Sequence, residues 1–152
     1  MKPKTIITIS FFLFSSKIFA QFQPIYYADY SYADRHLLRG GLEFMLANNT
    51  KNHNKLFLGT GYGMVNYNGK IHGIPDLHLS YNVETLLFAK LGSSNYHAYS
   101  LIGISVFNTV DLGIGYSFPY KNSSVKIQGF TIGATIRFTK KDDVYGKLKI
   151  GF

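Results

Sequence analysis

The most constraining feature of the sequence is an alternation of apolar and polar residues with a period of two. It is clearest within residues 125–139, where every even position from Phe130 to Phe138 is apolar and the positions between them are Thr, Gly or Arg. A period of two places the two sets on opposite faces of a β-strand. The pattern recurs in residues 37–47, 76–90 and 111–120, so the sequence predicts an all-β fold.

Polar turns rich in Gly and Asn divide the chain after Gln21 into a series of predicted strands. Eight strands of about 10 residues, with their turns, fit the available length. An even number of such strands favours a closed antiparallel up-and-down β-barrel. The predicted strands cover residues 24–32, 37–47, 55–67, 76–90, 96–107, 110–120, 125–139 and 144–152.

The first 20 residues have the features of a secretory signal peptide. Lys2 and Lys4 precede an apolar run that extends to about residue 16, and Ala20 provides a small residue at the junction with Gln21. The run is too short for a transmembrane helix, which needs about 20 residues; an uncleaved N-terminal anchor is the alternative. Cleavage near Ala20 would leave one barrel domain, residues 21–152, with a net charge of +5 and no Cys to form disulfides.

The side chains on the two faces indicate which face points outward. The apolar face carries Leu, Ile, Phe and Tyr, whereas the polar face combines glycines with a few long charged residues. The interior of an eight-stranded barrel is only just wide enough for side chains, so Gly beside Arg or Glu would leave room there. This pattern predicts a transmembrane barrel with its apolar face toward lipid. A soluble, lipocalin-like periplasmic binding barrel with an apolar lumen is the alternative.

The last nine residues are predicted to form the strand that closes the barrel, and the chain ends on an aromatic residue. Apolar positions on one face, with the terminal aromatic, are Val144, Leu148, Ile150 and Phe152. With the signal peptide and the alternation, this strand resembles that of small eight-stranded outer-membrane β-barrels of the OmpA/OmpX type. The resemblance implies a monomer in the outer membrane of a diderm bacterium, in contact with outer-membrane lipid, lipopolysaccharide and the outer-membrane assembly machinery.

Several charged residues share the predicted inward face. A buried charge without a partner costs several kcal/mol, so these residues are expected to pair. We therefore predict a lumen plugged by salt bridges and a structural or envelope-maintenance role without catalysis; a small-ion path lined by the same groups is the alternative. The predicted lumenal residues are Arg39, Glu43, Glu84, Asp111, Arg137, Lys147 and Lys149, with Asp29 as an addition.

An enzymatic alternative rests on His78, Ser80 and Glu84, which share one face of a predicted strand. A His base beside a Ser nucleophile is the arrangement used in acyl transfer. The His-x-Ser sequence is similar to that of lipid A deacylases, which are also outer-membrane barrels. Tyr81 departs from that pattern, and the alternation points both side chains into the lumen, away from a lipid substrate.

The remaining polar residues suggest contacts at the membrane surface. Basic residues in the connections predicted to lie outside are candidates for contact with lipopolysaccharide phosphates. The other His residues lack the ligand spacing of a zinc site, no cofactor is expected, and the basic residues form no patch suited to nucleic acid. The candidates for lipopolysaccharide contact are Arg35, Lys70, Lys140 and Lys141.

Overall fold

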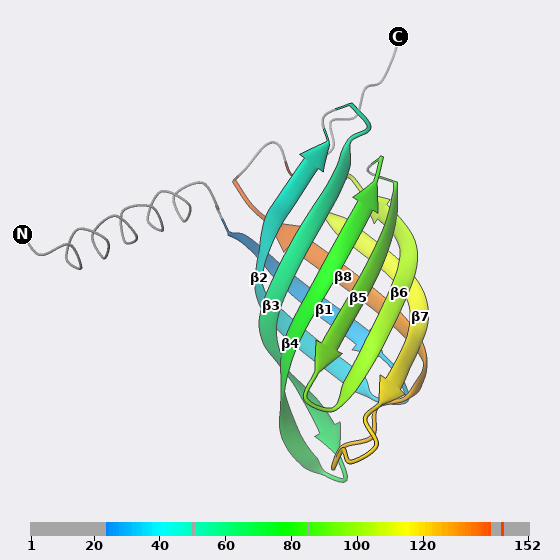
Figure 1. Cartoon of the computed structure of the whole chain (residues 1–152). Coiled ribbons are helices and arrows are strands. Elements are labelled where there is room, and N and C mark those ends of the chain that lie inside the picture. The colour runs from blue at the N-terminus through cyan, green and yellow to red at the C-terminus, as the bar shows by residue number, and fades with distance from the viewer. Residues whose placement is uncertain (1–23, 50, 85, 141–143, 145–152) are drawn as a thin grey trace, which may run out of the picture.

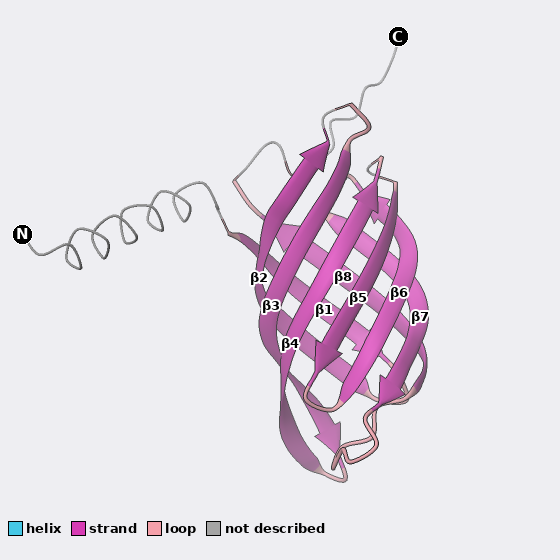
Figure 2. Cartoon of the chain, in the orientation of Figure 1, coloured by secondary structure: helices cyan, strands magenta, loops and turns pink. Residues whose placement is uncertain are grey.

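The chain folds into a closed barrel in which each strand pairs antiparallel with the next and β8 pairs with β1 (Figure 1). The computed structural model describes residues 24–49, 51–84, 86–140 and 144. Strands and short connections make up the barrel, as Figure 2 shows, which confirms the predicted all-β antiparallel barrel. The strands are β1 (Ile25–Tyr32), β2 (His36–Asn49), β3 (Asn54–Tyr67), β4 (Lys70–Val83), β5 (Leu87–Ser94), β6 (His97–Val106), β7 (Val110–Pro119) and β8 (Gly129–Phe138). Within the described ranges, no helix is long and apolar enough to cross a membrane.

The barrel is closed by β8, which pairs with β1 from Tyr26↔Phe138 to Tyr32↔Ile132. The prediction that residues 144–152 form the closing strand is wrong, because β2 and β8 occupy both edges of β1. Val144 is buried beside Ile25 and Phe57. The other residues assigned to that strand, Leu148, Ile150 and Phe152, lie outside the described residues, as does the predicted signal peptide.

The predicted strand 76–90 is in fact parts of two strands, β4 and β5, joined by a tight turn. The amide of Leu86 donates a hydrogen bond to the carbonyl of Val83 at 3.0 Å, and Glu84 has a positive φ of 50°. The turn contains none of the Gly, Pro, Asn or Asp residues that usually mark a chain reversal. The apolar–polar alternation therefore continues through this turn without a break, and residues 76–90 were predicted as one strand. Because two strands were counted as one, the prediction needed residues 144–152 to complete a set of eight.

The two ends of the barrel differ in their connections. We call the end where β1 begins and β8 ends the terminal end; the turns after β2, β4 and β6 also lie there. The opposite, loop end carries the turns after β1, β3 and β5 and the long connection 120–128 between β7 and β8. The β3–β4 hairpin projects beyond the loop end (Figure 1), because the pairing of β4 with β5 stops at Asp76↔Ser94.

The strands expose large apolar side chains on the outer wall and bury polar side chains inside. In β7, which pairs with β6 and β8, Leu112 and Ile114 are 46% and 52% exposed, whereas the neighbouring Asp111 is fully buried. The same alternation is clear in β1, in the parts of β4 and β5 that pair with each other, and in β8. The predicted orientation of the two faces is therefore confirmed.

Glycines make room for the large polar side chains in the lumen. A Cβ atom at Gly59 would overlap the imidazole ring of His78, and one at Gly63 would overlap the Arg39 side chain and the backbone of β2. In a barrel of eight strands, a side chain at either position would compete with the polar group for the same space. The predicted pairing of small and long residues on the inner face is thus present at these positions.

Candidate functional site

The lumen contains a balanced set of buried charges. Among the described residues, four basic and four acidic side chains on the strands are at most 5% exposed. Such a set has no formal excess of either sign, as expected for charges removed from water. The bases are Arg39, Lys55, Lys90 and Arg137, and the acids are Asp29, Glu43, Asp76 and Asp111.

Arg39 organises the part of the lumen nearer the loop end. Its guanidinium group contacts Asp29 through Nη2 at 2.6 Å and through Nε at 2.9 Å, and Asp76 through Nη1 at 3.1 Å. The guanidinium carbon lies 4.5 Å from the centroid of the Tyr99 ring, and the Tyr99 hydroxyl donates to Asp76 at 3.0 Å. Nη2 also donates to Ser31 at 3.0 Å. The planar, multidentate guanidinium therefore joins β1, β2 and β4.

Arg137 organises the part nearer the terminal end. Its Nε and Nη2 groups contact the Glu43 carboxylate, and its Nη1 group contacts Asp111 at 2.6 Å. Nη2 also donates to Ser80 Oγ at 3.2 Å. The guanidinium carbon lies 4.8 Å from the centroid of the Phe57 ring. One side chain on β8 thereby contacts residues of β2, β3, β4 and β7.

His78 connects these two groups of charges. Its Nδ1 atom lies 2.8 Å from Asp76 Oδ2, and its Nε2 atom lies 2.8 Å from Glu43 Oε1. The imidazole thus joins the two carboxylates, one through each ring nitrogen. We call the residues joined in this way the lumenal network: Asp29, Arg39, Glu43, Asp76, His78, Lys90, Asp111 and Arg137.

Lys90 completes the lumenal network from β5. Its Nζ atom lies 3.3 Å from Asp29 Oδ2 and 2.5 Å from Thr135 Oγ1. The Thr135 hydroxyl in turn donates to Asp29 at 2.8 Å. Lys90 thus reaches from one wall of the barrel to the opposite one, where β1 and β8 meet.

Apolar residues cover the lumenal network at both ends of the barrel. At the loop end, Val125 and Ile127 from the 120–128 connection pack against Leu37, Val65 and Ile74. At the terminal end, the cover consists of Ile25, Phe57 and Val144, with Met45 packed against them. Among the residues that the structure describes, the interior of the barrel therefore holds paired charges between two clusters of packed apolar side chains.

The predicted lumenal residues have different outcomes. Arg39, Glu43, Asp111, Arg137 and the addition Asp29 lie in the lumenal network. Glu84 does not, because it lies exposed in the turn between β4 and β5. Lys147 and Lys149 lie outside the described residues.

Sequence reasoning missed three members of the buried charge set. Asp76 lies on the same face of β4 as His78, and Lys90 lies on the same face of β5 as Phe88. Lys55 is buried on β3. A signal for the first two was present in the sequence, because both have the same even parity as His78 within the stretch read as one strand. The even parity alone could have identified Asp76 and Lys90 as lumenal residues, but it could not have identified their partners on other strands.

The structure gives each of the three residues of the enzymatic alternative a different environment. His78 and Ser80 both point into the lumen, as their alternation predicted, but the His78 nitrogens are engaged by Asp76 and Glu43. The Ser80 hydroxyl donates to Asn82 at 3.1 Å and accepts from Arg137. Glu84 is exposed at the terminal end. A His base must lie within hydrogen-bonding reach of its Ser nucleophile, and here each is bonded elsewhere.

The candidates for lipopolysaccharide contact lie at two different ends of the barrel. Arg35 and Lys70 are at the loop end, in the β1–β2 turn and at the start of β4. Lys140 follows β8 at the terminal end, so its grouping with Arg35 and Lys70 was wrong. The missed hairpin caused this error, because it moved every later connection to the other end. Lys141 lies outside the described residues.

The part of the chain that the structure describes contains no group of three or more His, Asp or Glu residues arranged to hold a metal ion. Comparison with protein-family models, with curated proteins and with solved structures gives no match to the chain. The fold and the lumenal network therefore carry the functional argument.

Proposed function

We propose that this protein is a small transmembrane β-barrel of the outer membrane of a diderm bacterium, with a sealed lumen and a structural, non-catalytic role in the envelope. The observation that carries the proposal is the reversed distribution of polarity. Leu77, Leu91 and Ile102 on the outer wall are 55%, 65% and 63% exposed, whereas Arg137 inside is completely buried. A soluble barrel would have the opposite arrangement.

A hydrocarbon environment accounts for both faces together. Closure satisfies the backbone hydrogen bonds between strands, which is the condition for a β-structure to span a bilayer. Monomeric soluble proteins rarely expose contiguous apolar patches larger than a few hundred Å². Here large apolar side chains are exposed on all eight strands, so the apolar surface surrounds the barrel.

The filled lumen supports a structural role over transport or binding. A lipocalin-like protein needs an apolar cavity for its ligand, but the lumen here is occupied by paired charges. Conduction of solutes needs a wider barrel, since porins use 16–18 strands. The apolar covers at both ends also oppose the passage of ions. The protein is then a rigid barrel that can contact other molecules only through its outer wall and its two ends.

Fractionation of cells that express the full chain tests the proposal. The protein should remain in the outer membrane until detergent is added, and should migrate on SDS gels at different positions before and after boiling. The sealed lumen predicts, in addition, no conductance steps in planar bilayers. Recovery of the protein in the soluble periplasmic fraction, without a heat-dependent change in migration, would overturn the membrane assignment.

A further inference from the structure

The connection 120–128 is a segment that lies over the loop end of the barrel, beside the β3–β4 hairpin (Figure 1). It has nine residues, whereas the other connections between strands have two to four. Val125 and Ile127 are fully buried, and Ser124, Lys126 and Gln128 are exposed. This alternation gives the segment an apolar face toward the interior of the barrel and a polar face outward.

Two side chains hold the middle of this segment in place. Val125 and Ile127 pack against Leu37, Val65 and Ile74. Within the described chain, no hydrogen bond joins residues 121–127 to a strand of the barrel. The strands themselves are paired along both edges. A segment with few buried contacts and no backbone pairing belongs to the least stable parts of a fold, which open without global unfolding.

Both ends of the segment are attached at defined points. At its start, the amide of Tyr120 donates to the carbonyl of Tyr96 at 2.9 Å, and the hydroxyl groups of Tyr120 and Ser93 lie 2.6 Å apart. At its end, Gly129 has a φ of 100°, and a Cβ atom there would meet nothing within 4 Å. Glycine reaches conformations on both sides of φ = 0°. Gly129 is therefore suited to act as a hinge.

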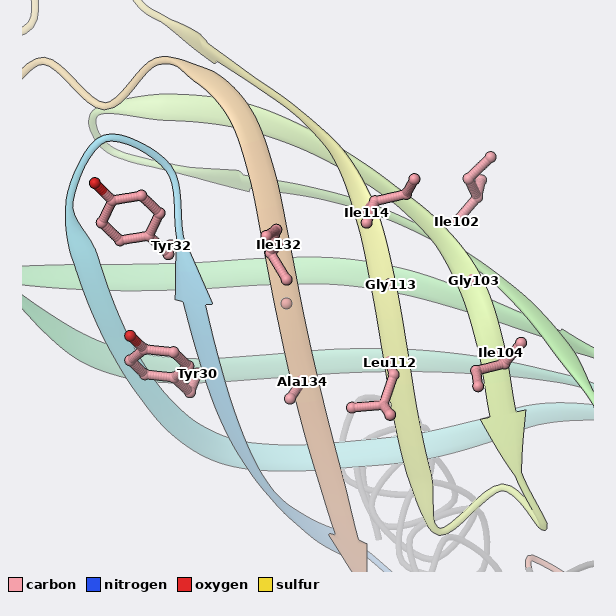
Figure 3. Close-up of a pocket in the computed structure, with 11 residues that line it drawn as sticks. Tyr30, Tyr32, Ile102, Gly103, Ile104, Leu112, Gly113, Ile114, Ile132 and Ala134 are labelled. Carbon is pink, nitrogen blue, oxygen red and sulfur yellow. The ribbon is translucent and has the colours of Figure 1, made fainter.

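The segment lies at the end of the two strands that it connects, next to a buried pair of hydroxyl groups. Ser117 Oγ on β7 lies 2.8 Å from Thr131 Oγ1 on β8, and both residues are at most 2% exposed. Their side chains face inward, opposite to Ile114 and Ile132, which project from the outer wall in Figure 3. Access of water to Ser117 thus reports whether the loop end is open.

We infer that residues 120–128 form a hinged lid, which opens about Gly129 and admits water to the loop end of the lumen while the strands stay paired. Opening withdraws Val125 and Ile127 from the apolar cluster. It separates no strands, because the lid has no part in the backbone ladder of the barrel. The ion pairs of the lumenal network remain, so an open lid creates no path through the barrel. The inference does not depend on the membrane location.

The test measures how fast a water-soluble methanethiosulfonate reagent modifies Ser117→Cys in the full-length protein in detergent micelles. The chain has no other Cys, and Ser117 is buried, so modification requires opening. Ile127→Ala removes contacts that hold the lid closed and should raise the rate about tenfold or more. Ile25→Ala is the matched control, because it makes the same change at an equally buried position in the cluster at the terminal end. It should leave the rate unchanged.

A second pair of variants tests the hinge. Gly129→Ala strains the closed lid at its positive φ and should also raise the modification rate of Ser117→Cys. Gly69→Ala adds comparable strain in the β3–β4 turn, where φ is 75° and a Cβ atom would again have free space, and should not raise it. Ser105→Cys, buried near the terminal end of β6, is the reporter for opening elsewhere, and no lid variant should change its rate.

Four results would overturn the inference. Equal increases for Ile127→Ala and Ile25→Ala, or a parallel increase at Ser105→Cys, would mean that the barrel opens as a whole. No increase for Ile127→Ala would mean that the segment does not control access, and equal rates for Gly129→Ala and Gly69→Ala would remove the hinge. Thermal unfolding is recorded for every variant. If Ile127→Ala does not fold, Ile127→Val replaces it and should raise the rate by a smaller factor, with Ile25→Val as its control.

Discussion

The guanidinium of Arg137 contacts the carboxylate of Glu43 across the lumen, although the two residues are 94 positions apart and their strands are not neighbours. β1 lies between β8 and β2, so this ion pair adds a connection that the backbone ladder does not make. With Asp111, it surrounds the guanidinium with two carboxylates. The energetic consequences of this arrangement can be measured by substitution.

Arg137→Leu should lower the free energy of unfolding by about 3–5 kcal/mol, because it leaves Glu43 and Asp111 buried without their cation. The measurement is the urea midpoint of the protein in detergent micelles. Lys126→Leu is a matched control, since Lys126 is exposed in the 120–128 connection. An unchanged midpoint for Arg137→Leu would show that the charge cluster is unimportant for stability.

Gly59→Ala should destabilise the barrel by about 1–3 kcal/mol, because the added methyl group competes with the His78 ring for the same space. Gly40→Ala is the control: its added methyl group would meet only the carbonyl oxygen of Tyr27, at 3.4 Å. Thermal unfolding of both variants should show a shift for Gly59→Ala alone. Equal shifts would mean that strand flexibility, and not lumenal space, explains the glycine.

His78→Asn should cost about 1–3 kcal/mol, because the shorter amide does not satisfy both Asp76 and Glu43. His53→Asn provides the same chemical change in an exposed turn, at a positive φ that Asn also tolerates. The two urea midpoints should therefore differ. If both variants unfold together with the unmodified protein, His78 does not bridge the two carboxylates in solution.

Ser80→Ala should leave the acylation of lipid A unchanged in cells, because the Ser80 hydroxyl bonds Asn82 and Arg137 and not His78. Stability should fall by about 1 kcal/mol through the lost hydrogen bonds. Mass spectrometry of extracted lipid A from cells that express each form provides the comparison. A change in acyl-chain number that depends on Ser80 would revive the enzymatic alternative.

Single cysteines should report the direction of the side chains cleanly, because the chain contains no Cys of its own. A lipid-soluble maleimide should label Ile114→Cys on the outer wall and spare Ser117→Cys, which replaces a buried lumenal residue. Asp34→Cys at the loop end is exposed and should react with a water-soluble reagent. Labelling of Ser117→Cys in preference to Ile114→Cys would mean that the assigned faces are reversed.

Alternation was sufficient to predict the barrel and the directions of Arg39, Glu43, Asp111 and Arg137, because a strand has only two faces. It failed at the turn 84–86, where no residue with a strong turn preference interrupts the pattern. That single omission also caused the wrong closing strand and the wrong end for Lys140. Pairings such as Arg137 with Glu43 depend on barrel register and on which strands meet across the lumen, which no local pattern contains.

The hydrogen bond from Thr135 to Asp29 spans 106 positions, at the junction where the last strand meets the first. During synthesis β1 is made early, but its second edge must wait until β8 has emerged. An unpaired edge is a template for pairing with other chains, and contacts this distant in sequence form slowly. The opening strand must therefore stay shielded from other chains until β8 is available to pair with it, and a chain left unshielded too early is expected to associate through that edge.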